Sequence, residues 1–306
     1  MKRVLITGAA GFVGRSLDSF LKKDYPSYEV YGIDVSFKKS TPKYFKIDIN
    51  DKRPLRNIIK NIKPHYIFHL AGCSQKIEKF PELVSINLFG TYSLLDSVQN
   101  GGNFKTRIII PGSAAEYGRV LRRDLPVAEE HPLNPINFYG LSKMYQTSLA
   151  LSYCRRGLDI VVGRIFNISG WASPRSLSVG NFAYEISLIE RGCKKPVIET
   201  KDLNSGRDFL DIKDVCSALV SIAENGRSGR AYNICSGRSY KIRDALNYLI
   251  GLSNVARIKV KSSSCGSEIK NIKGLIEKIK KDTKWEPKIS ISESLKNTLD
   301  YYRNIA

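Results

Sequence analysis

The sequence lacks any run of about eighteen apolar residues, so no segment is long and apolar enough to cross a bilayer as a helix. Its first residues enter a short apolar strand, without the charged and apolar regions of a secretory signal peptide. We therefore predict no membrane partner and expect the protein to remain in the cytoplasm.

The cysteines also lack a pattern. No Cys-x-x-Cys pair occurs, and the chain has only three histidines, which argues against zinc and against a disulfide framework. We expect no bound metal and reduced thiols that mostly fill the core. The six cysteines are Cys73, Cys154, Cys193, Cys216, Cys235 and Cys265.

Acidic residues are scarce relative to basic ones, with 29 Asp plus Glu against 49 Lys plus Arg and a net charge of +20. This surplus favours anionic partners, and a non-catalytic RNA-binding or regulatory protein is one interpretation. The basic residues are spread along the chain, with a local density at 270–284 in a helix-like amphipathic stretch. A solvated lysine-rich face explains them more simply, and diphosphate cofactors and sugar nucleotides are also anions.

A glycine-rich turn over 7–14 separates a short apolar strand at 4–6 from an amphipathic helix. Strand, glycine turn and helix in this order are typical of a pyrophosphate-binding unit. Gly8 permits the tight turn, Gly11 lets the backbone approach the pyrophosphate, and Gly14 lets helix and strand pack closely. The sequence therefore predicts a dinucleotide cofactor bound at the helix N-terminus.

A carboxylate ends the second predicted strand, 29–33. Asp34 lies twenty residues beyond the last glycine of the turn, where it can accept hydrogen bonds from the adenosine ribose hydroxyls and would repel a 2′-phosphate. It favours NAD(H) over NADP(H), but Lys38 and Lys39 follow closely and leave NADP(H) open.

Asp48 and Ile49 end a third predicted strand, 44–47, where they are placed to meet the adenine. Asp48 can instead cap the following helix, 52–61. Both interpretations stay open at this point.

A buried strand is predicted at 65–70, followed by the small residues Ala71 and Gly72, which suit a chain that passes beside a cofactor. A long helix is predicted next, at 81–99. His69 lies in the strand, and we interpret it as a structural residue rather than a catalytic one.

Tyr139 and Lys143 are four residues apart and, in a helix, project from one face about one turn apart. An ammonium about 4 Å from the phenol is worth roughly 4 kcal/mol in a partly dry site, or about three pKa units, so we expect a lowered tyrosine pKa. Such a phenol is a usable general acid or base. The alternative is a helix-face aromatic beside a solvated lysine. Ser113 favours the first interpretation, because it follows a predicted strand at 107–110 and so lies at the ligand-binding edge of a parallel sheet.

Four motifs in order carry a family resemblance. They are Gly-Ala-Ala-Gly-Phe-Val-Gly at 8–14, His-Leu-Ala-Gly at 69–72, Ser-Ala-Ala-Glu-Tyr-Gly at 113–118 and Tyr-Gly-Leu-Ser-Lys at 139–143. Together they resemble an extended short-chain dehydrogenase/reductase of the NAD-dependent epimerase/dehydratase type, over essentially the whole chain.

The resemblance implies an α/β fold, a Rossmann-type doubly wound parallel sheet with a smaller carboxy-terminal substrate domain. Residues 1–167 are expected to form the NAD-binding domain, with some later segments returning to it, and 168–306 mainly the sugar-nucleotide domain. An irregular segment at 168–180 is expected to cross between them. A homodimer is expected to form through the helices at 81–99 and 138–155.

The resemblance also implies roles for individual residues. The catalytic triad would be Ser113, Tyr139 and Lys143. The cofactor residues would be Gly8, Gly11, Phe12, Val13, Gly14, Asp34, Asp48, Ile49, Leu70, Ala71, Gly72, Tyr139, Lys143 and Phe166. The substrate residues would be Ser74, Ser113, Ala114, Asn167 and Arg207. Arginine's fork suits a diphosphate; the alternative for Arg207 is a local ion pair with Asp208 or Asp211.

Within that family the chain is most similar to GDP-4-keto-6-deoxymannose reductases, through segments 63–71, 112–118, 126–130 and 232–237. This similarity implies NAD(P)H-dependent reduction of the 4-keto group of a nucleotide-linked 4-keto-6-deoxyhexose. The Ser-Ala-Ala run at 113–115 is closer to that of epimerases, so a 4-epimerase is the alternative. The related 4,6-dehydratases have an acid/base pair at the positions of Ala114 and Ala115, which argues against water elimination here.

Overall fold

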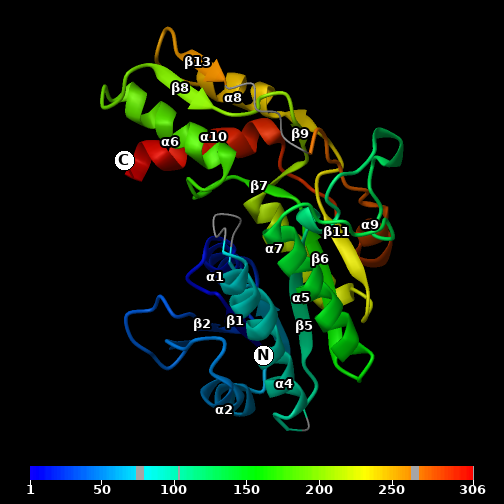
Figure 1. Ribbon diagram of the computed structural model, residues 1–306. Coiled ribbons are helices and arrows are strands. Elements are labelled where there is room, and N and C mark those ends of the chain that lie inside the picture. Colours follow the sequence, from blue (N-terminus) through cyan, green and yellow to red (C-terminus); the bar gives the residue numbers. More distant parts are fainter. Residues whose placement is uncertain (74–78, 103, 263–268, 306) are drawn as a thin grey trace.

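The computed structural model describes residues 1–73, 79–102, 104–262 and 269–305. The described chain forms two lobes, a sheet lobe in the lower part of Figure 1 and a small lobe above it. The two lobes meet where the strands of the sheet end, and this junction contains the site described below.

Seven parallel strands form the sheet, in the order β11-β6-β5-β4-β1-β2-β3. They are β1 Lys2–Thr7, β2 Tyr28–Ile33, β3 Tyr44–Phe45, β4 Tyr66–His69, β5 Arg107–Ser113, β6 Asp159–Ile165 and β11 Ala231–Ile234. Their centres are runs of apolar residues buried on both faces, as a parallel sheet requires. The order reverses direction between β1 and β4, where ligands bind in doubly wound sheets. The predicted Rossmann-type fold is confirmed.

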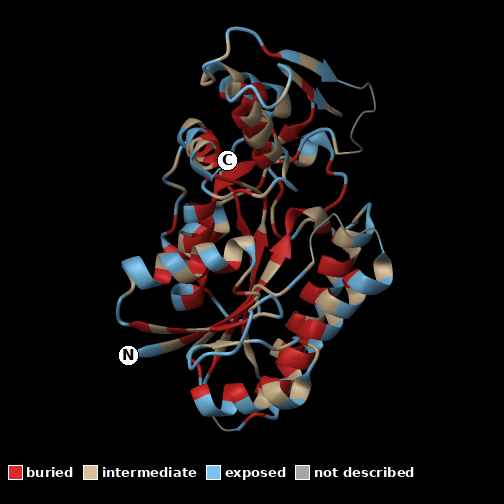
Figure 2. Ribbon diagram, turned by 90° about the vertical axis from the view of Figure 1, so that its left-hand side faces the viewer, coloured by how far each residue is buried: buried red, intermediate tan, exposed pale blue. Residues whose placement is uncertain are grey.

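Helices cover both faces of this sheet. One face packs against α1 Phe12–Asp24, α7 Ile212–Asn225 and α9 Glu277–Thr283. The other packs against α2 Lys52–Ile62, α4 Gly90–Gln99 and α5 Phe138–Cys154. Figure 2 shows that buried residues follow the sheet and the sides of the helices that face it. The apolar face of each helix therefore forms one half of a core whose other half is the sheet.

The long helix predicted at 81–99 is continuous but not uniform. It begins as α3 Phe80–Leu83, passes through a π-helical segment, η1 Val84–Phe89, and continues as α4. The π segment adds one residue to a turn, and such insertions occur frequently at functional sites. Here Asn87 lies inside this turn and is fully buried.

The small lobe has its own core. It consists of α6 Ser178–Glu190, α8 Ile242–Gly251 and α10 Ile291–Ile305 with the strand pair β8 Val197–Thr200 and β13 Lys259–Ser262. Two short strand pairs lie toward the junction, β7 Asn167–Ser169 with β10 Phe209–Asp211, and β9 Gly206–Arg207 with β12 Tyr240–Lys241. The segment expected to be irregular at 168–180 is more ordered than that, because it begins in β7 and ends in the first turn of α6.

The helix predicted at 270–284 is wrong for its first half. Residues 270–275 are not helical and form bridges from Asn271 to Gly206 and from Gly274 to Val127, and only α9 is helical. Backbone hydrogen bonds to remote segments explain this, since Leu275 donates to the Val127 carbonyl at 2.9 Å and Ile272 donates to the Gly206 carbonyl at 3.2 Å. The lysine pattern is helical in spacing, but these backbone hydrogen bonds hold residues 270–275 out of a helix.

Within the described part of the chain, five cysteines are free thiols and no group of His, Cys, Asp or Glu side chains could hold a metal ion. Cys265 lies outside the described residues. None of the described helices combines the length and the apolar character that crossing a membrane requires.

Candidate active site

The glycine turn after β1 is packed more tightly than any side chain allows. Gly8 has φ +70, and a Cβ there would lie 2.5 Å from the carbonyl oxygen of Leu70. A Cβ at Gly14 would lie 2.1 Å from the Gly8 carbonyl oxygen. These contacts bring the start of α1 against the turn and against the end of β4, which keeps the backbone surface of the turn flat and free of side chains.

The N-terminus of α1 begins in this turn. Gly11 is the N-cap and provides no side-chain cap, and the first turn of α1 contains no acidic residue. The first N–H groups of a helix lack intrahelical partners and favour an anion. Phe12 and Val13 start the helix and pack partly against the sheet core. The turn and helix therefore fit the pyrophosphate of a dinucleotide.

Asp34 lies directly beside the turn. Its carboxylate accepts hydrogen bonds from the backbone N–H of Ala10 at 2.9 Å and of Ser36 at 2.8 Å. An ionised carboxylate has about four acceptor positions. Two therefore remain for the hydroxyls of a ribose, and the carboxylate itself is held in place by the turn.

Asp48 does not cap α2, so that alternative is wrong. The N-cap of α2 is Asp51, and the carboxylate of Asp48 accepts from the backbone N–H of Asn50 at 2.9 Å instead. Ile49 is buried against Gly90, where a Cβ would lie 2.8 Å from the Ile49 side chain. The segment lies at the edge of the sheet beyond β3, on the side of α4.

The end of β4 is attached to the end of β1. Leu70 donates its backbone N–H to the Thr7 carbonyl at 3.0 Å, and Ala71 donates its own to the Thr7 hydroxyl at 3.2 Å. Gly72 passes beside Asn87, close enough that a Cβ would lie 3.1 Å from the Asn87 amide oxygen. Leu70, Ala71 and Gly72 therefore form a surface of small and apolar residues next to the glycine turn.

Ser113 and Tyr139 come from different elements and lie together. Ser113 is the last residue of β5, and Tyr139 is in the first turn of α5. The Ser113 side chain forms a hydrogen bond with the Tyr139 hydroxyl. The side chain of Asn137 caps α5 by accepting from the Gly140 N–H at 2.8 Å, which fixes the start of the helix and so the position of Tyr139.

The expected lowering of the Tyr139 pKa is wrong for this structure. Burial raises the pKa of Tyr139 above its ordinary value, and the hydrogen bond from Ser113 offsets only part of that effect. The Lys143 amine donates to the side-chain oxygen of Gln146 and is not among the groups that shift the pKa of Tyr139. The phenol is therefore a proton donor that stays protonated at neutral pH.

Lys143 is buried one turn along α5 from Tyr139. Burial lowers the pKa of Lys143 from 10.5 to about 8, and the carboxylate of Glu116 acts in the opposite direction. A lysine with this pKa can exchange a proton near neutral pH, which an ordinary surface lysine does not do.

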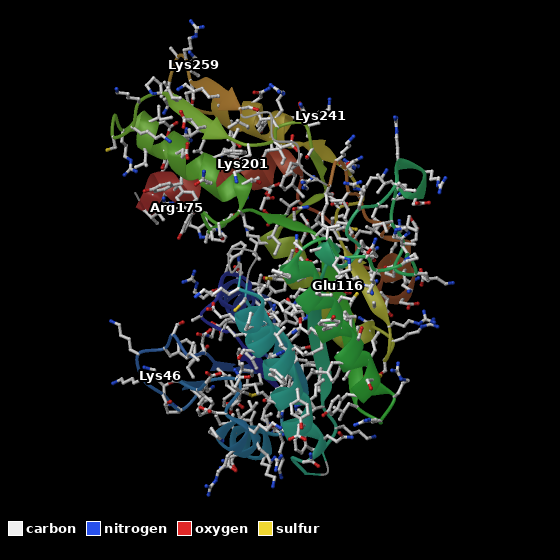
Figure 3. All side chains as sticks on the ribbon, in the orientation of Figure 1. Lys46, Glu116, Arg175, Lys201, Lys241 and Lys259 are labelled. Atoms are coloured by element: carbon white, nitrogen blue, oxygen red, sulfur yellow. The ribbon has the colours of Figure 1, made fainter. Side chains whose placement is uncertain are left out.

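A buried ion pair lies directly behind Ser113. The Nε of Arg164 is 3.1 Å from one carboxylate oxygen of Glu116, and the other oxygen accepts from the Ser113 N–H at 2.7 Å and from the Thr147 hydroxyl at 3.1 Å. Arg164 also donates to the Tyr117 hydroxyl at 3.1 Å. Figure 3 labels Glu116 beside the upper part of α5. This ion pair anchors the end of β5 to β6 and α5.

Two of the residues expected to contact substrate, Asn167 and Arg207, lie in the short strands β7 and β9 toward the junction. Ala114 is buried in a cluster with Phe166, and Asn167 begins β7, with its side-chain amide 3.3 Å from the Asp208 carbonyl. The Arg207 guanidinium donates to the carbonyls of Gly206 and Ile269, both at 2.9 Å. The expected residue Ser74 lies outside the described part of the chain.

Asp208 and Asp211, the two carboxylates considered as partners of Arg207, are engaged elsewhere. Asp208 accepts from Ser236 and from backbone N–H groups that include Gly237 and Gly274. Asp211 caps α7 and accepts from the Ser294 hydroxyl at 2.6 Å.

Sequence reasoning assigned no role to Gln146, Asn87, Arg164 or Glu116. Gln146 has a signal in the sequence, because it follows Lys143 by three residues and so lies on the same helix face. Arg164 and Asn87 have none, since their partners come from remote segments. Glu116 belongs to a recognised motif, but its ion pair with Arg164 exists only in the folded chain.

Known proteins are similar to this chain over almost its whole length. Residues 5–298 match the family model described as GDP-mannose 4,6 dehydratase. A GDP-6-deoxy-D-mannose reductase from Pseudomonas aeruginosa is 29% identical over 307 residues, covering 97% of this chain and 96% of the relative. A GDP-6-deoxy-D-talose 4-dehydrogenase from Aggregatibacter actinomycetemcomitans is 25% identical over 253 residues, covering 82% and 80%.

Among solved structures, RMD from Pseudomonas aeruginosa in complex with NADPH is similar over the whole of both chains. The TM-score is 0.88, the sequence identity is 28%, and the alignment covers 100% of each chain. The resemblance to the extended short-chain dehydrogenase/reductases is thus confirmed, and this chain belongs to the GDP-mannose 4,6 dehydratase family.

Proposed function

We propose that this protein is an NAD(P)H-dependent reductase of the 4-keto group of a GDP-linked 4-keto-6-deoxyhexose. The observation that carries the proposal is the meeting of Ser113, Tyr139 and Lys143 at one end of the sheet, beside the glycine turn. A hydroxyl, a protonated phenol and a buried amine are the groups that a carbonyl reduction needs.

In this proposal Ser113 and Tyr139 act on the ketone oxygen, and Lys143 binds the nicotinamide ribose. A reduced nicotinamide cofactor held by the glycine turn and Asp34 would supply the hydride for the ketone carbon. Ser113 donates a hydrogen bond to the ketone oxygen, and Tyr139 transfers its proton to that oxygen as the negative charge develops, so that a secondary alcohol forms. The phenol holds this proton at neutral pH, because burial keeps the pKa of Tyr139 above its ordinary value. The phenolate then recovers a proton from solvent.

The substrate class is supported by the two relatives described above, whose names both specify a redox reaction on a GDP-linked 6-deoxyhexose. In our proposal Asn167 and Arg207, together with Ser74, bind the nucleotide sugar. We also propose that residues 1–167 act mainly in cofactor binding and 168–306 mainly in substrate binding.

Water elimination is disfavoured by the residues next to Ser113. Ala114 and Ala115 contribute only methyl groups there, so no side chain of theirs can remove a proton from the sugar or return one to a leaving hydroxyl. Ser113, Tyr139 and Lys143 instead support hydride and proton transfer to the 4-keto group.

A direct assay tests the proposal. Purified protein is mixed with NADPH or NADH and with GDP-, dTDP-, CDP- or UDP-linked 4-keto-6-deoxyhexoses, and the decrease in absorbance at the nicotinamide band is followed. We expect stoichiometric oxidation with the GDP-linked substrate. Tightly retained NAD, found by mass spectrometry of the purified protein, with no net oxidation would support the 4-epimerase instead.

We propose NADH as the preferred cofactor, with NADPH also accepted. Asp34 supports this preference, because a carboxylate held beside the glycine turn repels a 2′-phosphate. The similar RMD structure contains NADPH, and Lys38 and Lys39 lie close in sequence to Asp34, so a comparison of the two cofactors is part of the assay.

We further propose a homodimer that forms through α4 and α5. Large hydrophobic side chains are exposed along these helices and at the end of η1, among them Phe89, Tyr92, Phe138 and Tyr145. Clustered exposed aromatics are typical of protein interfaces. Light scattering should give twice the monomer mass, and Phe89→Asp with Tyr145→Asp should give the monomer mass; a wild-type monomer would contradict the proposal.

A further inference from the structure

The Lys143 amine is bonded to one side chain that the proposed chemistry does not use. It donates to the side-chain oxygen of Gln146, and the amide nitrogen of Gln146 donates to the Thr91 hydroxyl at 2.7 Å. Gln146 and Thr91 are fully buried, and Lys143 is 6% exposed. The amide therefore joins α5 to α4 through the lysine itself.

This contact is the end of a longer chain of buried hydrogen bonds. The Thr91 hydroxyl donates to the Asn87 carbonyl at 2.6 Å, so its lone pairs accept from Gln146 and from His69 Nε2, which is 2.9 Å away. His69 Nδ1 then accepts from the Thr7 hydroxyl at 2.8 Å. The Thr7 oxygen in turn accepts from the Ala71 N–H.

Counting donors and acceptors assigns every proton in this chain. The Thr91 hydroxyl hydrogen is engaged with the Asn87 carbonyl and cannot be donated to His69. His69 must therefore carry its proton on Nε2 and present a lone pair on Nδ1. Burial lowers the pKa of His69 to about 3, with a smaller effect in the same direction from the Lys143 charge. The imidazole is therefore neutral, and each of its nitrogens has a partner.

The chain links the residue before the glycine turn to the proposed catalytic amine. It runs from Thr7 at the end of β1, through His69 at the end of β4 and Thr91 in α4, to Gln146 and Lys143 in α5. A buried polar atom that loses its partner costs about 1–3 kcal/mol. Each member is thus held by the next, and the position of the amine is fixed by three elements besides its own helix.

We propose that Gln146 is a positioning residue, which holds the Lys143 amine toward the cofactor side of the junction through the buried hydrogen-bond chain that ends at Thr7. The inference rests on the proposed function for its catalytic consequence only. The contacts that carry it are properties of the folded chain.

The choice of an amide at 146 has an electrostatic reason. The titratable groups facing Lys143 are Glu116 behind Ser113, His69 on β4 and Tyr139 on its own helix. His69 is neutral and Tyr139 is protonated, so Glu116 is the one facing charge among the described residues. An amide orients the amine without adding a second negative charge, which would favour the ammonium and raise the pKa of Lys143.

Two substitutions of Gln146 separate its effect on the orientation of the Lys143 amine from its effect on the charge nearby. Gln146→Glu keeps an acceptor oxygen of the same reach for Lys143 but adds a charge and removes the donor to Thr91. Gln146→Leu removes both hydrogen bonds at similar volume. Gln99→Glu is the matched control, because it makes the same change at an exposed glutamine at the end of α4.

The first measurement needs no turnover. Lysine labelled with ¹³C at the ε-carbon is incorporated, the Lys143 signal is assigned by its loss in Lys143→Arg, and its chemical shift is followed against pH. We expect Gln146→Glu to raise the midpoint by at least one pH unit and Gln99→Glu to leave it in place. An unchanged midpoint in Gln146→Glu would overturn the inference, whatever the activity.

The second measurement is the pH profile of kcat with the GDP-linked substrate. Gln146→Leu should lower kcat at least tenfold, and Gln146→Glu should recover part of that loss with its alkaline limb displaced upward. Wild-type kcat and pH profile in Gln146→Leu would contradict positioning. If wild-type protein turns over no 4-keto sugar, the proposed function fails, and the lysine titration still decides this inference.

Discussion

The backbone N–H of Ser113 donates a 2.7 Å hydrogen bond to the buried carboxylate of Glu116, three residues later. The same carboxylate is paired with Arg164 across the neighbouring strand. A charged acceptor makes this bond stronger than one between neutral groups. Ser113 is therefore fixed at the end of β5 by a buried ion pair.

Replacing Glu116 with glutamine should destabilise the protein strongly. The change is nearly isosteric, but it leaves the buried guanidinium of Arg164 without its counter-charge, which typically costs about 3–5 kcal/mol. We expect this decrease in the free energy of unfolding in urea, together with a reduced kcat as Ser113 loses its charged anchor.

Glu130→Gln is the control for that substitution. Glu130 pairs with Lys278 at the surface, where its side chain is 70% exposed, and exposed pairs contribute at most about 1 kcal/mol. Equal effects of the two substitutions would show that the buried pair has no special part in the stability of the site.

Tyr139→Phe should remove turnover and leave the cofactor bound. The ring and its packing remain, and only the hydroxyl that carries the proton is lost, so we expect kcat to fall about 10²–10⁴-fold. Titration of NADH fluorescence should give an unchanged Kd. Tyr145→Phe, on the exposed side of the same helix, should keep full activity; retained turnover in Tyr139→Phe would rule out its role as the acid.

Gly14→Ala should weaken both folding and cofactor binding. A Cβ at this position would lie 2.1 Å from the carbonyl oxygen of Gly8, so helix α1 must move away from the glycine turn. We expect a loss of about 1–3 kcal/mol, as for other overpacked sites, and a weaker Kd for NADH.

The comparison substitution is Gly251→Ala, at the end of α8. A Cβ there meets no atom within 4 Å, and alanine favours helix over glycine by up to about 1 kcal/mol. We expect an unchanged or slightly higher unfolding midpoint. If Gly14→Ala changes neither the stability nor the Kd for NADH, the glycine turn adjusts to the added methyl group without affecting the site.

His69 should make folding sensitive to mild acid. Its pKa is lowered from 6.5 to about 3 in the folded protein, so between these values the unfolded chain binds a proton that the folded chain does not. The contribution of His69 to the free energy of unfolding is therefore fully present above pH 6.5. It decreases as the pH falls below that value, by up to about 1.4 kcal/mol per pH unit. Urea unfolding at pH 7, 6 and 5 should show a steeper loss for wild type than for His69→Leu. Parallel losses would contradict a neutral buried imidazole.

Asp34→Asn should change the cofactor preference. The carboxylate is held beside the glycine turn by the Ala10 N–H, and removing its charge removes its repulsion of a 2′-phosphate. We expect the ratio of kcat/KM for NADPH to that for NADH to rise at least tenfold, while the unfolding midpoint changes little. An unchanged ratio would assign the preference to other residues of the adenosine site.

Local sequence patterns were sufficient to predict much of this fold. The glycine turn, the strand before it and the helix after it could be predicted because each depends on residues that are neighbours in sequence, and the four family motifs predicted the sheet and its class. The helix expected at 270–284 failed for the opposite reason. Its spacing is helical, but Leu275 and Ile272 donate backbone hydrogen bonds to Val127 and Gly206 in remote segments, and this pairing overrides local preference.

The sequence by itself determined which groups are available for chemistry: a serine after β5, and a tyrosine and a lysine one turn apart on α5. Only the tertiary structure decided their protonation and their partners. Burial raises the pKa of Tyr139 where sequence reasoning expected the lysine to lower it, and Gln146 rather than Tyr139 accepts from Lys143. Spacing along a helix fixes which side chains share a face, whereas desolvation and hydrogen-bond partners depend on every element that packs over that face.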